Sequence, residues 1–70
     1  MSRAPKAFAP QIVSANDLLI GDVVYLTGSE NWTRDIADAA VAETRIEAEG
    51  LLTAAISQQD RVVGPYLVDI

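Results

Sequence analysis

The chain contains neither cysteine nor histidine. Without cysteine it forms no disulfide and no thiolate metal site. Without histidine it lacks the commonest transition-metal ligand and the commonest general base of enzymes. Small domains often depend on disulfides or bound metals for stability, so this one must be stabilised mainly by its core or by association.

Glycine is scarce, and its four residues stand apart from one another. A glycine-rich phosphate-binding loop is therefore absent from the sequence, as is the Gly-Lys-Ser/Thr that would follow one. The serines have no histidine to activate them, and the single lysine, Lys6, lies in the N-terminal arm. We therefore expect a protein that is not an enzyme and carries no cofactor.

Long apolar runs are missing as well. No run approaches the roughly 20 residues that a membrane-spanning helix needs. Residues 1–10 contain no apolar stretch of the kind found in a secretory signal. These features predict a cytoplasmic protein that does not bind membranes.

Positive charge is in short supply. Ten acidic residues stand against five basic ones, for a net charge of −5 at pH 7. Arg3 and Lys6 lie in the first ten residues, so residues 16–70 hold all ten carboxylates and only three arginines. Nucleic acids and anionic membranes are bound through lysine and arginine, so neither is an expected partner. The acidity either keeps a small domain soluble or matches a basic protein.

Seventy residues make one domain. We predict a flexible N-terminal arm over residues 1–10 and a single domain over 11–70. A domain of this size buries only about 60% of its unfolded surface, so its stability is marginal. Formation of a homo-oligomer is therefore an open alternative.

Short runs rich in β-branched and aromatic residues predict strands. The second of these runs is apolar on both faces, which predicts a central strand. Asn16 and Asp17 favour a turn, and residues 28–31 have the length of a hairpin connection. The predicted strands cover residues 11–15, 23–27, 32–34 and 61–70.

Residues 35–43 are ambiguous. Their alanine content favours a helix, but Ile36, Ala39 and Ala40 make only a thin helical stripe. A separate helix start follows at Thr44, which argues against one continuous helix. We predict a strand here, bulged if necessary, with a helix as the alternative.

Residues 45–59 have the pattern of an amphipathic helix. Thr44 and Glu47 fit a capping box, in which each side chain accepts a hydrogen bond from the other residue's amide. Gly50 interrupts this helix at a cost of about 1 kcal/mol relative to alanine, so either a neighbour packs closely against it or stability is not maximised. The predicted buried face comprises Ala48, Leu51, Leu52, Ala55 and Ile56, at spacings of three and four.

The last strand has two distinctive features. Pro65 has no amide hydrogen, which predicts an edge strand or a bulge. The sequence ends at Ile70 within the apolar alternation of Tyr66, Val68 and Ile70, which predicts either a C-terminal truncation or a partner chain over that edge.

Four aspartates form two sequence-local pairs, Asp35 with Asp38 and Asp17 with Asp22. Paired carboxylates can bind a hard cation or serve as acid and base. A calcium or magnesium site needs more converging oxygens than these pairs supply, so we expect solvated or hairpin-closing carboxylates. A small-ligand or metal-binding module using Asp35 and Asp38 is kept as an alternative.

Several aromatic and turn residues are candidates for contact with a partner protein, because Trp, Tyr and Arg are enriched at binding hot spots. Trp32 either anchors the core beneath the helix or contacts a partner, and the core position is favoured. Tyr25 and Tyr66 are expected in the sheet with their hydroxyls at the rim. The candidate interaction residues are Trp32, Arg34, Tyr25, Gly64, Pro65 and Tyr66.

Five segments of the chain are distinctive as a set: residues 10–19, 21–26, 32–39, 47–49 and 63–69. Together they resemble a small family of uncharacterised bacterial proteins. The resemblance implies a gene neighbourhood beside sulfite reductase in proteobacteria and, by association, a role near sulfur assimilation. It implies sulfite reductase or an associated protein as the partner, and a chain that continues beyond the last strand. It supplies no catalytic residue. The segments are PQIVSANDLL at 10–19, GDVVYL at 21–26, WTRDIADA at 32–39, EAE at 47–49 and VGPYLVD at 63–69.

The sequence therefore predicts an α+β fold. A small antiparallel sheet of three to four strands, in β-β-β-α-β order, packs on one amphipathic helix, and its other face is partly exposed. An exposed sheet face on a small protein is a natural contact surface. The predicted function is that of a non-catalytic accessory or protein-interaction module, and a self-associating domain is the alternative.

Overall fold

The computed structural model describes residues 9–58 and 60–70. The fold is α+β with elements in the predicted β-β-β-α-β order, so the predicted fold class is confirmed. Most of the predicted N-terminal arm lies outside the described residues. The elements are β1 (Gln11–Asp17), β2 (Val23–Leu26), β3 (Trp32–Thr33), the 3-10 helix η1 (Ile36–Asp38), α1 (Arg45–Ile56) and β4 (Val62–Asp69).

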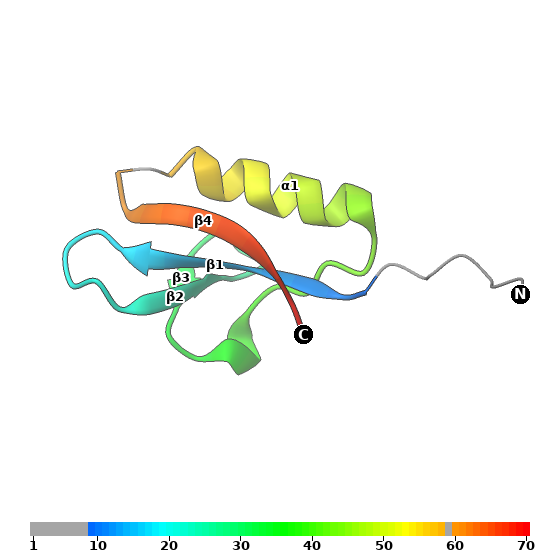
Figure 1. Cartoon of the computed structure of the whole chain (residues 1–70), viewed down its shortest axis with the longest axis horizontal. Helices are drawn as coiled ribbons and strands as arrows, with labels where there is room; N and C mark the ends of the chain where they lie inside the picture. Colours follow the sequence, from blue (N-terminus) through cyan, green and yellow to red (C-terminus); the bar gives the residue numbers. More distant parts are fainter. Residues whose placement is uncertain (1–8, 59) are drawn as a thin grey trace, which may run out of the picture.

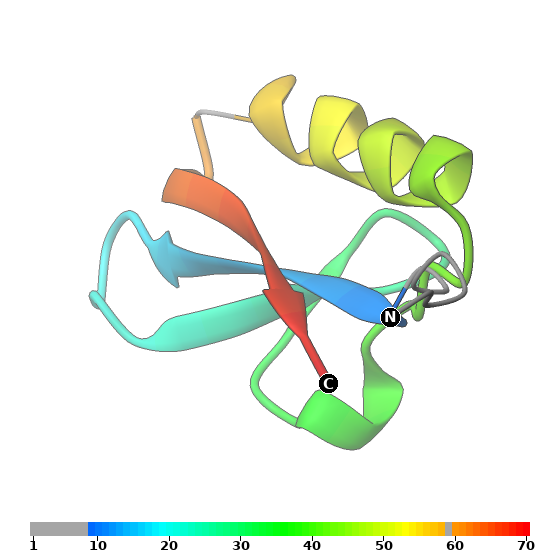
Figure 2. The same cartoon turned by 45° about the vertical axis from the view of Figure 1, so that its right-hand side comes forward.

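The four strands form one antiparallel sheet in the order β3-β2-β1-β4 (Figure 1). β2 lies between β1 and β3, as its two apolar faces predicted. Within residues 9–58 and 60–70, β4 pairs only with β1 and is an edge strand, which agrees with the placement of Pro65. The two helical elements, η1 and α1, follow β3 in the chain and lie on opposite sides of this sheet (Figures 1 and 2).

The β1–β2 connection is fixed by Asp17. Its backbone amide donates to the carbonyl of Asp22 at 2.8 Å, and the Gly21 amide donates to the carbonyl of Asp17 at 2.8 Å. The Asp17 carboxylate accepts hydrogen bonds from the amides of Leu19 and Ile20, each at 2.9 Å. Gly21 has φ +85°, a conformation that favours glycine. Asp17 is thus a hairpin-closing carboxylate, as expected.

Residues 35–43 form neither the predicted strand nor the alternative helix. They contain η1 and an isolated bridge between Gln11 and Ala42. The physical reason is local hydrogen bonding: the Asp35 carboxylate accepts from the amide of Ala37 at 3.0 Å, which starts a single 3-10 turn. The amide of Ala40 then donates to the carbonyl of Leu26 at 2.8 Å, so the segment crosses the end of β2.

The start of α1 agrees with half of the predicted capping box. The amide of Glu47 donates to the Thr44 hydroxyl at 3.1 Å, as predicted. The Glu47 carboxylate, however, accepts from the amide of Glu43 at 2.8 Å rather than from Thr44. The helix also ends at Ile56, before the predicted end at residue 59, and the hydroxyl of its C-cap residue, Ser57, donates to the carbonyl of Ala54.

The buried face of α1 is narrower than predicted. Ala48 and Ala55 are fully buried, and Leu51 and Leu52 are half-buried, but Ile56 is 45% exposed. Ile56 is the last helical residue, so no further turn holds it against the sheet. The prediction that Ile56 belongs to the buried face is therefore wrong.

The core lies between α1 and the sheet. One cluster joins Val13 and Leu26 to Ala55 of the helix, and a second joins Ala15, Val24 and Val62. No helix in the described residues is long and apolar enough to cross a membrane.

Candidate interaction surface

The strand register determines which side chains share the face of the sheet opposite α1. Residues directly opposite on neighbouring strands point to the same face. Ser14 of β1 lies opposite Tyr25 of β2 and Tyr66 of β4. Asn16 likewise lies between Val23 and Val63. These pairs define what we call the open face, whose larger side chains are Ile12, Val23, Tyr25, Val63, Tyr66 and Val68.

The open face is apolar and partly accessible: Ile12 and Ser14 are buried, and η1 lies on this side of the sheet (Figure 1). Val23 is 50% exposed, Val63 is 51% exposed and Tyr66 is 53% exposed. Tyr25 and Val68 are half-buried. None of the residues that the described register places on this face is charged. Such a charge-free centre of aromatic and aliphatic side chains is typical of a protein contact surface.

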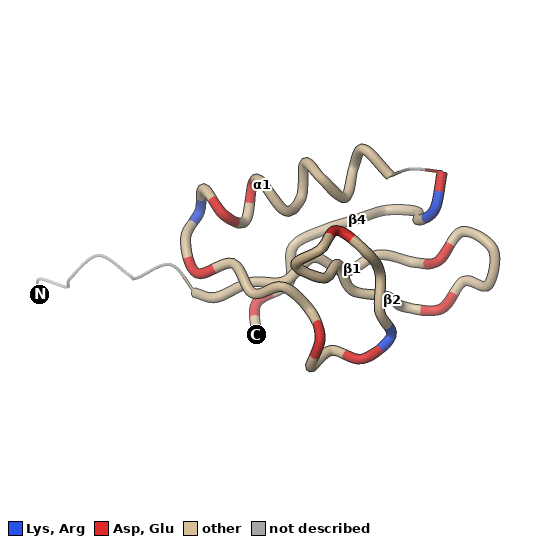
Figure 3. The backbone as a smooth tube through the Cα atoms, turned by 180° about the vertical axis from the view of Figure 1, so that it is seen from behind, with Lys and Arg blue, Asp and Glu red and all other residues tan. Residues whose placement is uncertain are grey.

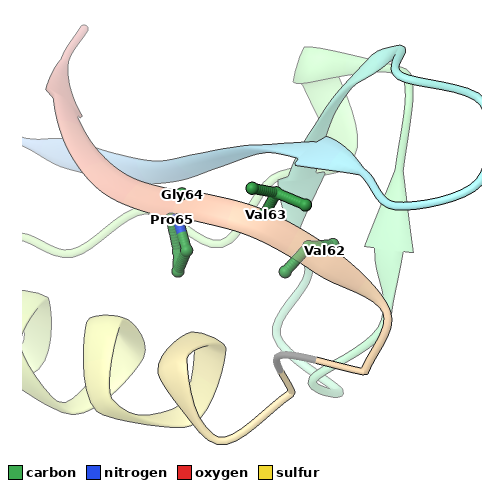
Figure 4. Close-up of a pocket in the computed structure, with 4 residues that line it drawn as sticks. All are labelled: Val62, Val63, Gly64 and Pro65. Carbon is green, nitrogen blue, oxygen red and sulfur yellow. The ribbon is translucent and has the colours of Figure 1, made fainter.

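A bulge in β4 shapes the open face. Two residues, Gly64 and Pro65, lie opposite Ala15 alone, because the register shifts between Ser14 and Asn16. Gly64 has φ +64°, which favours glycine. Figure 4 shows Val63 on one side of the strand and Pro65 on the other. Together with Val62, which packs on the α1 side of the sheet, these residues line a shallow concavity of about 320 Å³ along the β4 edge.

The β1–β2 turn extends this surface with three consecutive apolar side chains. Leu18 is 49% exposed, Leu19 is 93% exposed and Ile20 is 64% exposed. We call these three residues the apolar tip. The amide of Leu18 donates to the carbonyl of Arg61 at 3.0 Å, so the tip is tied to the start of β4 and lies next to the Val23–Val63 row. The hydrogen bonds that the Asp17 carboxylate accepts stabilise the conformation of the turn.

Acidic positions are spread over the described chain, from the β1–β2 turn to the ends of α1 and β4 (Figure 3). Asp17 and Asp22 lie at the base of the apolar tip, and Asp22 forms an exposed ion pair with Arg34 at 2.9 Å. Hydrogen bonds from the amides of Ile20 and Leu19 lower the pKa of Asp17 below its ordinary value of 3.8. The Asp17 carboxylate is therefore ionised at neutral pH.

Comparison with known proteins places the chain in a family. The family model described as a protein of unknown function, DUF2849, matches residues 11–70. The chain belongs to the DUF2849 family. No curated protein and no solved structure matches it significantly. Membership confirms the predicted resemblance to an uncharacterised family.

In this DUF2849 domain, four of the six candidate interaction residues come together. Tyr25 and Tyr66 lie on the open face, and Gly64 and Pro65 form the bulge beside it. Val23, Val63 and the apolar tip were not among the candidates. An indication of the tip was available in the sequence, because three apolar residues stand between Asp17 and Gly21, where polar turn residues are usual.

The other two candidates lie elsewhere in the DUF2849 domain. Trp32 is half-buried and packs against both core clusters, on the α1 side of the sheet. Its indole Nε1 donates to the side-chain oxygen of Gln58 at 3.2 Å. Trp32 therefore has the core position that the sequence analysis favoured over contact with a partner. Arg34 is exposed and pairs with Asp22.

The alternative carboxylate site has little geometric support. The Asp35 carboxylate serves as the cap of η1. Among residues 9–58 and 60–70, no group of three carboxylates converges in the way a metal ion requires. A second groove, of about 380 Å³, lies between α1 and the β2–β3 turn, where Glu30 and Glu47 flank the small residues Gly28, Ala40 and Gly50.

Proposed function

We propose that this DUF2849 domain is a non-catalytic interaction module that binds a partner protein through the open face and the apolar tip. The observation that carries the proposal is the uncharged face on which Val23, Val63 and Tyr66 are each about half exposed. Water-exposed apolar area of this kind lowers the free energy of association when a partner covers it.

The apolar tip supports the same function. Ordering a flexible loop on binding costs conformational entropy, and a preformed loop avoids much of that cost. The Asp17 carboxylate holds the amides of Leu19 and Ile20 in the free protein. The tip thus presents Leu19 in a fixed position, suited to insertion into an apolar pocket of the partner.

Charge argues for a different protein as the partner rather than a second copy. The described part of the chain carries ten carboxylates and three arginines, a net charge of −7. Two copies brought face to face would place these like charges around one interface, which is unfavourable. A partner with an apolar centre and a basic rim would be attracted instead.

The alternative functions have weaker support. Self-association through the edge of β4 would require a continuous ladder of backbone hydrogen bonds, and the bulge at Gly64 and Pro65 interrupts that edge. A metal-binding function would require Asp35, whose carboxylate already accepts a backbone hydrogen bond.

The resemblance gives the first partner to test, which is sulfite reductase or a protein associated with it in the cytoplasm. The tagged full-length chain should co-purify with sulfite reductase from the organism that encodes both. Deletion of the gene should slow growth with sulfate as the sulfur source. If the purified proteins do not associate and growth is unchanged, this partner is wrong.

Point variants test the surface independently of the partner's name. Tyr66→Ser and Leu19→Ser should each weaken the complex at least tenfold. Ile46→Ser is the matched control, because Ile46 is 83% exposed on α1, away from the open face. Equal weakening by all three variants would contradict the proposed surface. Sedimentation of the free chain as a stable dimer that Tyr66→Ser dissociates would also contradict it, in favour of self-association.

A further inference from the structure

The open face carries one feature that points to a more specific ligand. Tyr25 and Tyr66 stand on either side of Ser14 in one cross-strand row. Ser14 is only 2% exposed although it belongs to the open face. Its small side chain is therefore covered by larger neighbours, and the two tyrosines are the residues directly opposite it. We call this row the aromatic platform.

We propose that the aromatic platform binds an arginine side chain of the partner protein. This inference rests on the proposed function and adds the chemistry of the contact. A guanidinium group is planar and stacks on aromatic rings, to which it is also attracted as a cation. Tyr66, which is 53% exposed, offers the accessible ring for that stacking.

The charge distribution favours a cation at this place. The platform itself is uncharged, so a guanidinium meets no competing cation on the described open face. Asp17 and Asp22 adjoin the neighbouring Val23–Asn16–Val63 row at the hairpin end, where Asp22 is already paired with Arg34 and Asp17 remains as the carboxylate without a salt bridge in the described residues. With a net charge of −7 over the described residues, the domain attracts basic segments before contact.

Three other ligand classes fit less well. Lysine brings the same charge, but its ammonium group is compact and strongly hydrated, so it gains less from stacking. A proline-rich segment packs on aromatic rings but gains nothing from the acidic surroundings. Anionic lipid headgroups would be repelled. The platform should therefore discriminate arginine from lysine, proline and anionic surfaces.

The test uses three short peptides of defined sequence with the isotope-labelled full chain. Acetyl-GRGRG-amide, acetyl-GKGKG-amide and acetyl-GPGPG-amide are titrated while amide chemical shifts are recorded. The arginine peptide should shift the amides of Ser14, Tyr25 and Tyr66, with at least threefold higher affinity than the lysine peptide. Equal affinity for arginine and lysine, or shifts confined to the acidic hairpin end, would overturn the proposal. Tighter binding of the proline peptide would overturn it as well.

Variants separate stacking from simple attraction. Tyr66→Leu keeps apolar bulk and should abolish the preference for arginine over lysine. Tyr66→Phe keeps the ring and should preserve it. Ile46→Leu, outside the open face, should change nothing. If the preference is absent while Tyr66→Ser still breaks the complex with the partner, the arginine proposal fails and the proposed function stands. If Tyr66→Ser leaves that complex intact, the proposed function itself fails.

Discussion

Val63 and Tyr66 are three residues apart in β4, yet both point to the open face. In a regular strand, residues separated by an odd number lie on opposite faces. Here Val63 lies opposite Asn16 and Tyr66 lies opposite Ser14, two residues of β1 that share a face. The extra residue of the bulge reverses the alternation between them. It thereby buries Val62 to 2% exposure and leaves Val63 51% exposed.

The bulge should depend on glycine at position 64. Gly64 has φ +64°, where an L-residue with a Cβ atom is strained. Gly64→Ala should therefore lower the free energy of unfolding by about 1–2 kcal/mol, measured by urea denaturation. Gly28→Ala is the control, because a Cβ atom there meets nothing within 4 Å and its φ lies outside the left-handed region. Equal loss of stability in both variants would contradict a special role for Gly64.

Gly50 should be replaceable with a gain in stability. It lies in the interior of α1, and an added Cβ atom would meet nothing within 4 Å. The alternative that a neighbour packs closely against Gly50 is therefore wrong, and the alternative that stability is not maximised stays a prediction. Gly50→Ala should raise the free energy of unfolding by about 0.5–1 kcal/mol. If thermal unfolding shows that Gly50→Ala is less stable than the unmodified chain, the predicted gain in stability is wrong.

Asp17 should make the hairpin sensitive to acid. Because its folded pKa is lowered, the ionised form is favoured in the folded state. Its contribution to stability is present above the ordinary pKa of 3.8 and is lost as pH falls through the folded pKa. A carbon-13 titration of the Asp17 carboxyl should give a midpoint below 3.8.

The variant Asp17→Asn tests the same linkage through stability. Asparagine keeps an oxygen that can accept from the amides of Leu19 and Ile20, but it does not titrate. The fall in unfolding free energy between pH 7 and pH 2 should be smaller in this variant than in the unmodified chain. Asp38→Asn, at an exposed carboxylate of η1, is the matched control. If both variants show the same pH dependence, Asp17 has no special part in it.

The Gln58 side chain should contribute to the stability of the fold through its hydrogen bonds to Trp32 and Glu30. Its side chain accepts from the Trp32 indole at 3.2 Å and donates to the carbonyl of Glu30 at 3.0 Å. Gln58→Ala leaves a part-buried indole N–H without this acceptor, which should cost about 1–3 kcal/mol. Urea unfolding measures the loss. Thr53→Ala, on the exposed side of α1, should change stability by less than about 0.5 kcal/mol.

Trp32 fluorescence gives an independent check of its core position. In the free chain at low concentration, its emission should be blue-shifted and protected from iodide, because the indole packs against both core clusters. Protection that develops only at high concentration or with a partner would instead make Trp32 an interface residue.

Local signals in the sequence determined most of the elements. The hydroxyl of Thr44 and the spacing of Ala48, Leu51 and Ala55 predicted where α1 begins and which side is buried, because both signals act within one or two helical turns. Residues 35–43 could not be predicted in the same way. Their alanines fit either regular structure, and the outcome depended on the Asp35 cap and on the contact of Ala40 with Leu26.

The candidate surface was predictable by residue type but not by arrangement. Tyr25, Tyr66, Gly64 and Pro65 were chosen as aromatic and turn residues; the two tyrosines lie on the open face, and Gly64 and Pro65 form the bulge in β4, with Pro65 on the opposite side of the strand from Val63 (Figure 4). Trp32 was chosen on the same basis and lies on the opposite side of the sheet. Side-chain direction in a strand changes with every residue, so a small change in register decides between core and surface.

By itself, the sequence determined the α+β composition, the helix start at Thr44, the Asp17 turn, the acidic charge and the lack of histidine and cysteine. These properties depend on residue type or on neighbours close in the chain. Only the tertiary structure decided that Val63 joins Tyr66 on one uncharged face, because that depends on how β4 pairs with β1 across some fifty residues of chain. The bulge at Gly64, a single extra residue, set which valine was buried and which was exposed.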